Sequence, residues 1–138
     1  MPFEGELAVV IGRICRKVPV ERAAEVIFGY TIANDVTARD WQRSDGQWFR
    51  AKGSDTFLPL GPWINTHVTI EEAGTLSIET RLNDEVRQDG STSQMVRGIA
   101  IQHLDHPQPA QMVAHRQLVG GSHAAMQLHR HVDHLRIE

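Results

Sequence analysis

The sequence predicts a strand-dominated α+β domain. Residues 76–82 alternate apolar and polar side chains, which is typical of a strand with one buried face. The pair Asn83-Asp84 and the short run 85–88 follow directly, so this segment predicts a β-hairpin with a two-residue turn. The chain has 138 residues, which is the length of one domain and enough for a modest core.

The first predicted strand covers residues 4–12 and carries two acidic side chains. Successive side chains of a strand point to opposite faces, so Glu4 and Glu6 share one face, with their Cα atoms roughly 7 Å apart. The apolar residues at the odd positions take the other face. Such an acidic pair most often lies on a face of the strand that is exposed to solvent, and that alternative stays open. Where the face is shielded from water, a divalent cation would remove the cost of burying the carboxylates.

A helix and a second strand are expected next. Residues 19–26 predict a short helix, because proline is tolerated in a first turn and Ala, Glu and Arg favour helix. The β-branched and aromatic run 27–32 predicts a strand that brings Asn34 and Asp35 to its end, where chemistry is often found. A third carboxylate beside the first two would leave open positions for water and substrate. Hard oxygen ligands favour Mg²⁺, Mn²⁺ or Ca²⁺ over zinc.

The segment after this strand mixes helical and turn signals. Thr37 is expected to cap a helical turn that runs through Trp41. A polar loop at 44–48 follows, and Lys52 comes after it. The run 58–64 contains two prolines and a glycine, which predicts a rigid turn leading into another strand.

Three ordered blocks of the sequence, at 4–12, 29–42 and 52–63, resemble the fumarylacetoacetate hydrolase family. The resemblance is greatest to bacterial members that are 2-hydroxyhepta-2,4-diene-1,7-dioate isomerases or acylpyruvate hydrolases, and it covers about residues 3–95. It implies a mainly β architecture, a mixed β-sandwich roll around a metal site, which would be incomplete in this chain. We also expect a homodimer.

The same resemblance implies a metal centre. Two Glu and one Asp in the family's blocks bind Mg²⁺ or Mn²⁺, which implies that the ligands here are Glu4, Glu6 and Asp35. Ca²⁺ is a further candidate, because it also takes oxygen ligands.

The resemblance implies three further site residues. Arg39 and Gln42 match side chains that contact the acid end of the family's substrates, and Lys52 matches its active-site lysine. A lysine beside an oxo-acid can hold the oxygen of an enolate by charge when a C–C bond breaks or a double bond migrates. The local sequence leaves two alternatives open: Arg39 could simply pair with Asp40, and Lys52 could be an ordinary surface lysine.

The likeness ends near residue 95, which predicts a partial catalytic core at 1–95 and a divergent tail at 96–138. Seven of the eight histidines lie in the tail, and the family's Thr-Gly-Thr-Pro loop is not found there. We expect the tail to be disordered or translated out of frame. Several relatives carry a segment before the first strand with a His and Glu acid/base pair, and we expect this chain to lack that pair.

Composition excludes several classes of function. The net charge is −3 at pH 7 without a basic block, so we expect no nucleic-acid partner and no membrane-surface partner. The single cysteine, Cys15, excludes an internal disulfide and is typical of a reducing cytoplasm. No signal peptide and no apolar run of membrane-spanning length is visible. The expected localisation is therefore cytoplasmic.

Together these features predict a divalent-metal-dependent hydrolase or isomerase that acts on 2-oxo or 2-hydroxydienoic acids in the catabolism of aromatic compounds. The shared first step would be the build-up of negative charge on the oxygen next to the acid, in an enolate-like transition state. The sequence does not choose among C–C hydrolysis, isomerisation and decarboxylation, because the outcome depends on where water enters and which group takes the proton. Two alternatives stay open: an inactive fragment that binds a metal or an oxo-acid, and an interaction subunit completed by a partner.

Overall fold

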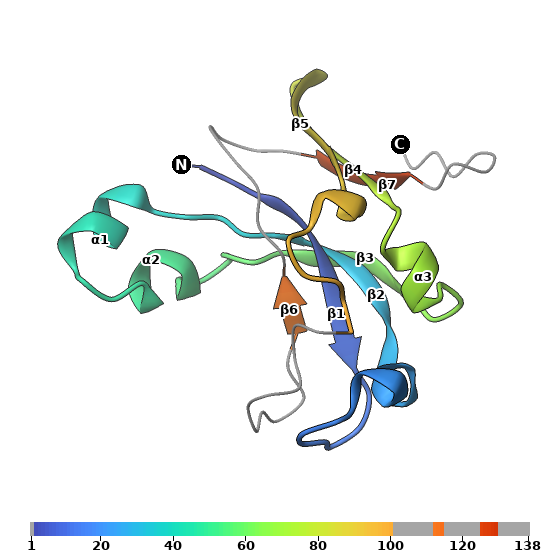
Figure 1. The fold of residues 1–138 in the computed structure, drawn as a ribbon. Coiled ribbons are helices and arrows are strands. Elements are labelled where there is room, and N and C mark those ends of the chain that lie inside the picture. Colours follow the sequence, from blue (N-terminus) through green and yellow to red (C-terminus); the bar gives the residue numbers. More distant parts are fainter. Residues whose placement is uncertain (1, 101–111, 115–124, 130–138) are drawn as a thin grey trace.

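A computed structural model describes residues 2–100 together with two strands at 112–114 and 125–129. Strands dominate, and the helices between them are short. Figure 1 shows the elements in chain order. They are β1 (Gly5–Ile11), the 3₁₀ helix η1 (Val20–Glu25), β2 (Ile27–Asn34), α1 (Arg39–Ser44), α2 (Phe49–Gly53), β3 (Leu60–Asn65), α3 (Ile70–Ala73), β4 (Ser77–Leu82), β5 (Glu85–Ser91), the 3₁₀ helix η2 (Thr92–Gln94), β6 (Met112–Ala114) and β7 (Ala125–His129).

The described strands form two antiparallel sheets (Figure 1). One sheet has the order β3-β2-β1-β6, and the other has the order β5-β4-β7. The central pair is β1 and β2, whose register places Glu6 opposite Ala33. This register shifts at a bulge between Val10 and Ile11, near the end of β1. The acidic end of β1 therefore lies in the regular part of the pairing.

The core uses the odd-numbered face of β1. Leu7 and Val9 pack there with Tyr30 of β2, and all three side chains are buried. The buried part of this cluster is completed by one residue of α3, the residue before β4 and one residue after η2, namely Ala73, Leu76 and Ile99. Strand alternation leaves the opposite face of β1 for Glu4 and Glu6.

The predicted strands are confirmed. β1 and β2 fall on the segments expected for them, and the hairpin of β4 and β5 turns at the expected dipeptide. Asn83 and Asp84 have φ angles of 50° and 65°. Positive φ at both positions is what a type I′ turn requires, and Asn and Asp tolerate it better than most residues. The prediction of a strand-dominated α+β fold is therefore correct.

The helices differ more from the prediction. The helix expected at 19–26 is a 3₁₀ helix at Val20–Glu25, and the Thr37 cap is wrong, because the residue before α1 is Ala38 and Thr37 bonds elsewhere. Helix α2 was not predicted. Its five residues span little more than one turn, so they show no readable helical period. Among the described residues, no helix has the length and apolar character needed to cross a membrane.

Helix α3 was also not predicted, although the sequence contains its start signal. Thr69 accepts a hydrogen bond from the backbone N–H of Glu72, whose carboxylate accepts one from the backbone N–H of Thr69. This reciprocal pair is the capping box expected for Thr-x-x-Glu. A search for that pattern would have found the helix.

Two strands fall within the predicted tail at 96–138. β6 pairs with β1 at Val9 and Val113, and β7 pairs with β4 at Ile78 and Leu128. The other residues after position 100 lie outside the described part of the chain. The proposed origin of the tail and its boundary near 95 stay predictions.

The single tyrosine should make folding sensitive to alkali. Tyr30 is 2% exposed, its hydroxyl has no hydrogen-bond partner among the described residues, and burial, with a smaller effect from the charge of Glu71, raises its pKa to about 12. The unfolded side chain loses its proton near pH 10. Between about pH 10 and about pH 12 the unfolded state therefore ionises while the folded state stays protonated, which lowers the free energy of unfolding by roughly 2–3 kcal/mol.

Tyr30→Phe should remove this alkaline loss. The variant should also be as stable as the parent at neutral pH or about 1–2 kcal/mol more stable, because it removes a buried hydroxyl without a partner. Urea unfolding of both chains at neutral and alkaline pH measures the difference, and the ultraviolet absorbance of the one tyrosine reports its ionisation. Equal alkaline losses in the two chains would show that Tyr30 is not the group responsible.

Candidate metal centre

The pairing of β1 and β2 brings three carboxylates to one place. Glu4 and Asp35 exchange two backbone hydrogen bonds, with N···O distances of 3.2 and 2.9 Å. Residues opposite each other in an antiparallel pair project to the same face, and Glu6 lies two positions along from Glu4 on that face. One carboxylate oxygen from each residue lies within 4.8 Å of those from the other two. The sequence-based grouping of Glu4, Glu6 and Asp35 is thus reproduced by the fold.

The three residues suit a divalent cation. Glu4 and Glu6 are only 1% and 3% exposed, so two of the carboxylates are almost completely removed from water beside a third. Mutual repulsion and lost hydration make such a cluster costly, and a doubly charged ion compensates both. Octahedral Mg²⁺ with metal–oxygen distances of about 2.1 Å places its ligand oxygens roughly 3–4 Å apart, which the measured cluster allows. All three donors are hard oxygens, as Mg²⁺ and Mn²⁺ prefer.

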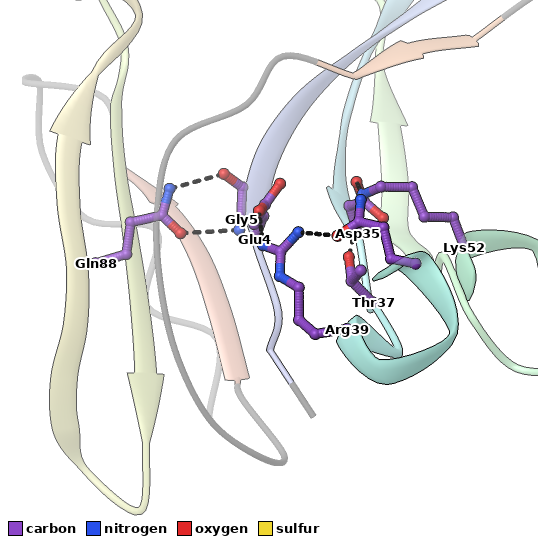
Figure 2. A network of polar contacts seen from close by, with 8 residues as sticks. Glu4, Gly5, Asp35, Thr37, Arg39, Lys52 and Gln88 are labelled. Atoms are coloured by element: carbon purple, nitrogen blue, oxygen red, sulfur yellow. Dashed lines mark hydrogen bonds and ion pairs between the residues drawn. The ribbon is translucent and has the colours of Figure 1, made fainter. Parts of the chain in front are cut away.

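Two cations from the helical hairpin α1–α2 reach this cluster (Figure 2). Arg39, at the start of α1, donates from Nη2 to Oε1 of Glu4 at 2.8 Å. Lys52, on α2, donates from Nζ to Oδ2 of Asp35, and it also donates to the hydroxyl of Thr37 at 3.0 Å. The alternative of Lys52 as an ordinary surface lysine is not supported, because its side chain is bonded at both of these positions.

The hairpin itself is held by contacts outside the site. Arg50 of α2 bonds both carboxylate oxygens of Asp45 at 2.7 Å, and its guanidinium lies 4.4 Å from the centre of the Trp41 ring. The backbone N–H of Ala38 donates to the carbonyl of Ala51 at 2.9 Å. These contacts fix α1 against α2, so that the two site cations are presented together.

Gln42 is joined to the same network. Arg39 donates from Nη1 to Oε1 of Gln42 at 2.7 Å, so one guanidinium links Gln42 to Glu4. The pairing of Arg39 with Asp40 considered above is replaced by these two contacts. The Nε2 atom of Gln42 is buried and has no hydrogen-bond partner within the described residues. A buried donor without a partner is unfavourable, so this atom marks a place where an acceptor would bind.

Two residues in contact with the centre were missed by the sequence reasoning. Thr37 is fully buried and receives the hydrogen bond from Lys52, where a helix cap was expected. Its position two residues after Asp35 was an available signal. Gln88 of β5 bonds the backbone of Gly5, which lies between the two glutamates. Gln88 and Gly5 are 83 positions apart in the sequence, so no local sequence pattern predicts their contact.

The structure thus defines a β-rich domain that presents a carboxylate cluster and two cations on one side of a sheet. Residues 1–106 match the family model of the fumarylacetoacetate (FAA) hydrolase C-terminal domain. The chain belongs to the fumarylacetoacetate hydrolase family, as the three sequence blocks indicated. Its strand-dominated architecture is the α+β fold of this family in incomplete form.

Known relatives support this assignment. The chain is 46% identical over 99 residues to the oxaloacetate tautomerase YisK of Bacillus subtilis, a match covering 72% of this chain and 33% of the relative. Among solved structures, 2-hydroxyhepta-2,4-diene-1,7-dioate isomerase from Mycobacterium marinum is 44% identical with a TM-score of 0.67, over 82% of this chain and 49% of that one. Maleylpyruvate hydrolase from Sphingobium, solved with manganese and pyruvate, is 37% identical with a TM-score of 0.62. This match covers 72% of this chain and 35% of that one. The chain spans little more than a third of the length of the first curated relatives it matches.

Proposed function

We propose that this chain carries the metal and the acid-binding part of an enzyme that cleaves or rearranges small 2-oxo or 2-hydroxydienoic acids. The observation that carries the proposal is the cluster of three carboxylate oxygens within 4.8 Å, with Arg39 and Lys52 hydrogen-bonded to two of its members. The cluster supplies ligands for a divalent cation, and the two cations supply binding for a negatively charged substrate.

Each side chain has a distinct role in this proposal. Glu4, Glu6 and Asp35 would hold Mg²⁺ or Mn²⁺. When bound, such an ion would act as a Lewis acid toward the acid group and the neighbouring oxygen of the substrate. Arg39 and Gln42 would orient the acid end. They are suited to this because Nη1 of Arg39 lies 2.7 Å from Oε1 of Gln42, and the buried Nε2 of Gln42 still has N–H groups to donate.

Lys52 would stabilise negative charge on the substrate oxygen as an enolate develops. Its ammonium is held beside Asp35 by two hydrogen bonds, so little reorganisation is needed when charge appears nearby. The named relatives are a tautomerase, an isomerase and a hydrolase. This range supports the shared class of oxo-acid and dienoic substrates and leaves the final reaction as a choice among hydrolysis, isomerisation and decarboxylation, within the catabolism of aromatic compounds.

The test is a turnover assay with the purified chain in Mn²⁺ or Mg²⁺. Oxaloacetate, an acylpyruvate and 2-hydroxyhepta-2,4-diene-1,7-dioate are offered in turn, and the ultraviolet absorbance of their enol or diene forms is followed. We expect at least one to be converted, with activity lost in chelator and restored by the metal. Metal binding without conversion would favour the inactive fragment that binds a metal or an oxo-acid, and conversion only after mixing with a full-length relative would favour the interaction subunit. Gel filtration of the same sample tests the proposed homodimer.

A further inference from the structure

The backbone edge of β1 that faces away from β2 meets the second sheet next to Glu4 and Glu6. Glu4 directs its backbone N–H and C=O toward Asp35 of β2. Backbone groups alternate in direction along a strand, so the N–H and C=O of Gly5 point to the opposite edge. β6 occupies that edge only from Ala8 to Val10 in the described pairing. Gly5 therefore needs another partner for its buried backbone groups.

Gln88 supplies that partner in place of a neighbouring strand. The N–H of Gly5 donates to Oε1 of Gln88 at 2.8 Å, and Nε2 of Gln88 donates to the carbonyl of Gly5, also at 2.8 Å (Figure 2). A carboxamide can do this because it has the same donor and acceptor as a peptide group. The two bonds fix which end of the amide faces which backbone group.

The amide is itself held in place by the second sheet. Thr80 of β4 lies opposite Gln88 of β5, and its hydroxyl donates to Oε1 of Gln88 at 2.9 Å. Thr80 is fully buried. The side chain that reaches Gly5 is therefore anchored by a hydrogen bond from this buried threonine across the β4–β5 pair.

The two bonded groups belong to the peptide units on either side of Gly5. The N–H of Gly5 is part of the peptide that joins it to Glu4, and its C=O is part of the peptide that joins it to Glu6. Fixing both peptide planes fixes the directions in which the two glutamate side chains leave the backbone. The two bonds from Gln88 therefore influence the distance between the carboxylates of Glu4 and Glu6, although Gln88 itself lies on the other sheet.

We propose that Gln88 is a positioning residue of the metal centre, whose carboxamide sets the relative orientation of Glu4 and Glu6. The inference rests on the metal-binding role proposed for these glutamates. A cavity of about 140 Å³ lined by Gly5, Leu7 and Gln88 among others adjoins the contact. Water entering from this cavity can satisfy the backbone of Gly5 when the amide is removed, but it does not hold the two peptide planes.

The test compares Gln88→Met with Gln94→Met in the full chain. Gln94 undergoes the same chemical change and lines the same cavity, but its amide accepts a hydrogen bond from the backbone of Ser91 at 3.2 Å and not from Gly5. The dissociation constant for Mn²⁺ is measured by electron paramagnetic resonance of the free and bound ion, and the thermal melt is recorded in chelator. We expect Gln88→Met to weaken Mn²⁺ binding about 10- to 100-fold and to alter the line shape of bound Mn²⁺. Gln94→Met should leave both unchanged.

Thr80→Val is the second variant and keeps the test decisive where Gln88→Met does not fold. It removes the hydroxyl that anchors the amide at nearly constant volume, and we expect it to weaken Mn²⁺ binding in the same direction, by a smaller factor. Parental affinity and line shape in whichever of these two variants folds would overturn the proposal. Absence of Mn²⁺ binding in the parent chain would instead overturn the metal centre itself, so the two failures are distinguishable.

Discussion

Asp35→Asn is expected to abolish useful metal binding and, with it, any turnover. The substitution keeps the shape of the side chain but replaces one of three anionic donors in the cluster with a neutral amide. We expect the dissociation constant for Mn²⁺ to rise by about 100-fold or more, equivalent to about 3 kcal/mol. Calorimetric titration measures this directly. A parallel thermal melt should move upward with millimolar metal in the parent and not in the variant, because a ligand that binds only the folded state raises its stability.

The matched control is Asp84→Asn. Asp84 is exposed in the turn between β4 and β5, so it undergoes the same chemical change away from the cluster and from the α1–α2 hairpin, and Asn tolerates its positive φ. Its Mn²⁺ affinity should equal that of the parent. A cooperative melt of Asp35→Asn in chelator shows that the chain is intact. An Asp35→Asn chain that folds and binds Mn²⁺ as tightly as the parent would remove Asp35 from the ligand set.

Lys52→Met is expected to separate catalysis from metal binding. The loss of a preorganised cation beside the reacting oxygen should lower kcat by about 10²- to 10³-fold. Removing a positive charge next to Asp35 should leave the affinity for Mn²⁺ unchanged or slightly higher, because like charges then repel less. Steady-state assays and the Mn²⁺ titration, performed on the same preparation, give the two quantities.

Lys17→Met serves as the control, because Lys17 is exposed on the segment between β1 and η1. It should change neither kcat nor Mn²⁺ affinity. If Lys52→Met lost affinity and turnover in proportion, the lysine would act by holding Asp35 in place, and the role in stabilising the enolate would be wrong. If neither quantity changed, Lys52 would have no part in the chemistry.

The carboxylate cluster was predictable from strand alternation together with the resemblance to the family, which pointed to these three residues. Alternation along one strand puts Glu4 and Glu6 on the same face, and a strand end places Asp35 beside them once the two strands pair. Burying the apolar face of each strand favours this register, because a shift of one residue would turn that face to solvent. The sequence carries that information in the residues next to the acidic ones.

The missed contacts depend on how the chain packs in three dimensions, for which the local sequence offers at most a weak signal. The hydroxyl of Thr37 could have capped α1, but the tertiary fold brings Lys52 within 3.0 Å of it and that bond forms instead. In the sequence, Gln88 looks like an ordinary polar residue of a hairpin. Its role is visible only in the folded chain, where the second sheet packs against β1 and the amide bonds the backbone of Gly5. Recognition of a backbone edge by a side chain has no sequence motif, because the backbone is the same at every position.

The bulge at Val10 and Ile11 affects which changes in chain length this fold can tolerate. A shift of one residue in strand pairing turns every side chain to the opposite face. An insertion in β1 before the bulge would therefore turn Glu4 and Glu6 away from Asp35. An insertion after it is absorbed where the pairing is already irregular, so the connection from Gly12 to η1 can lengthen or shorten without moving the carboxylates. The bulge thus separates the part of β1 whose length must be kept to hold the carboxylates together from the following connection, whose length can change.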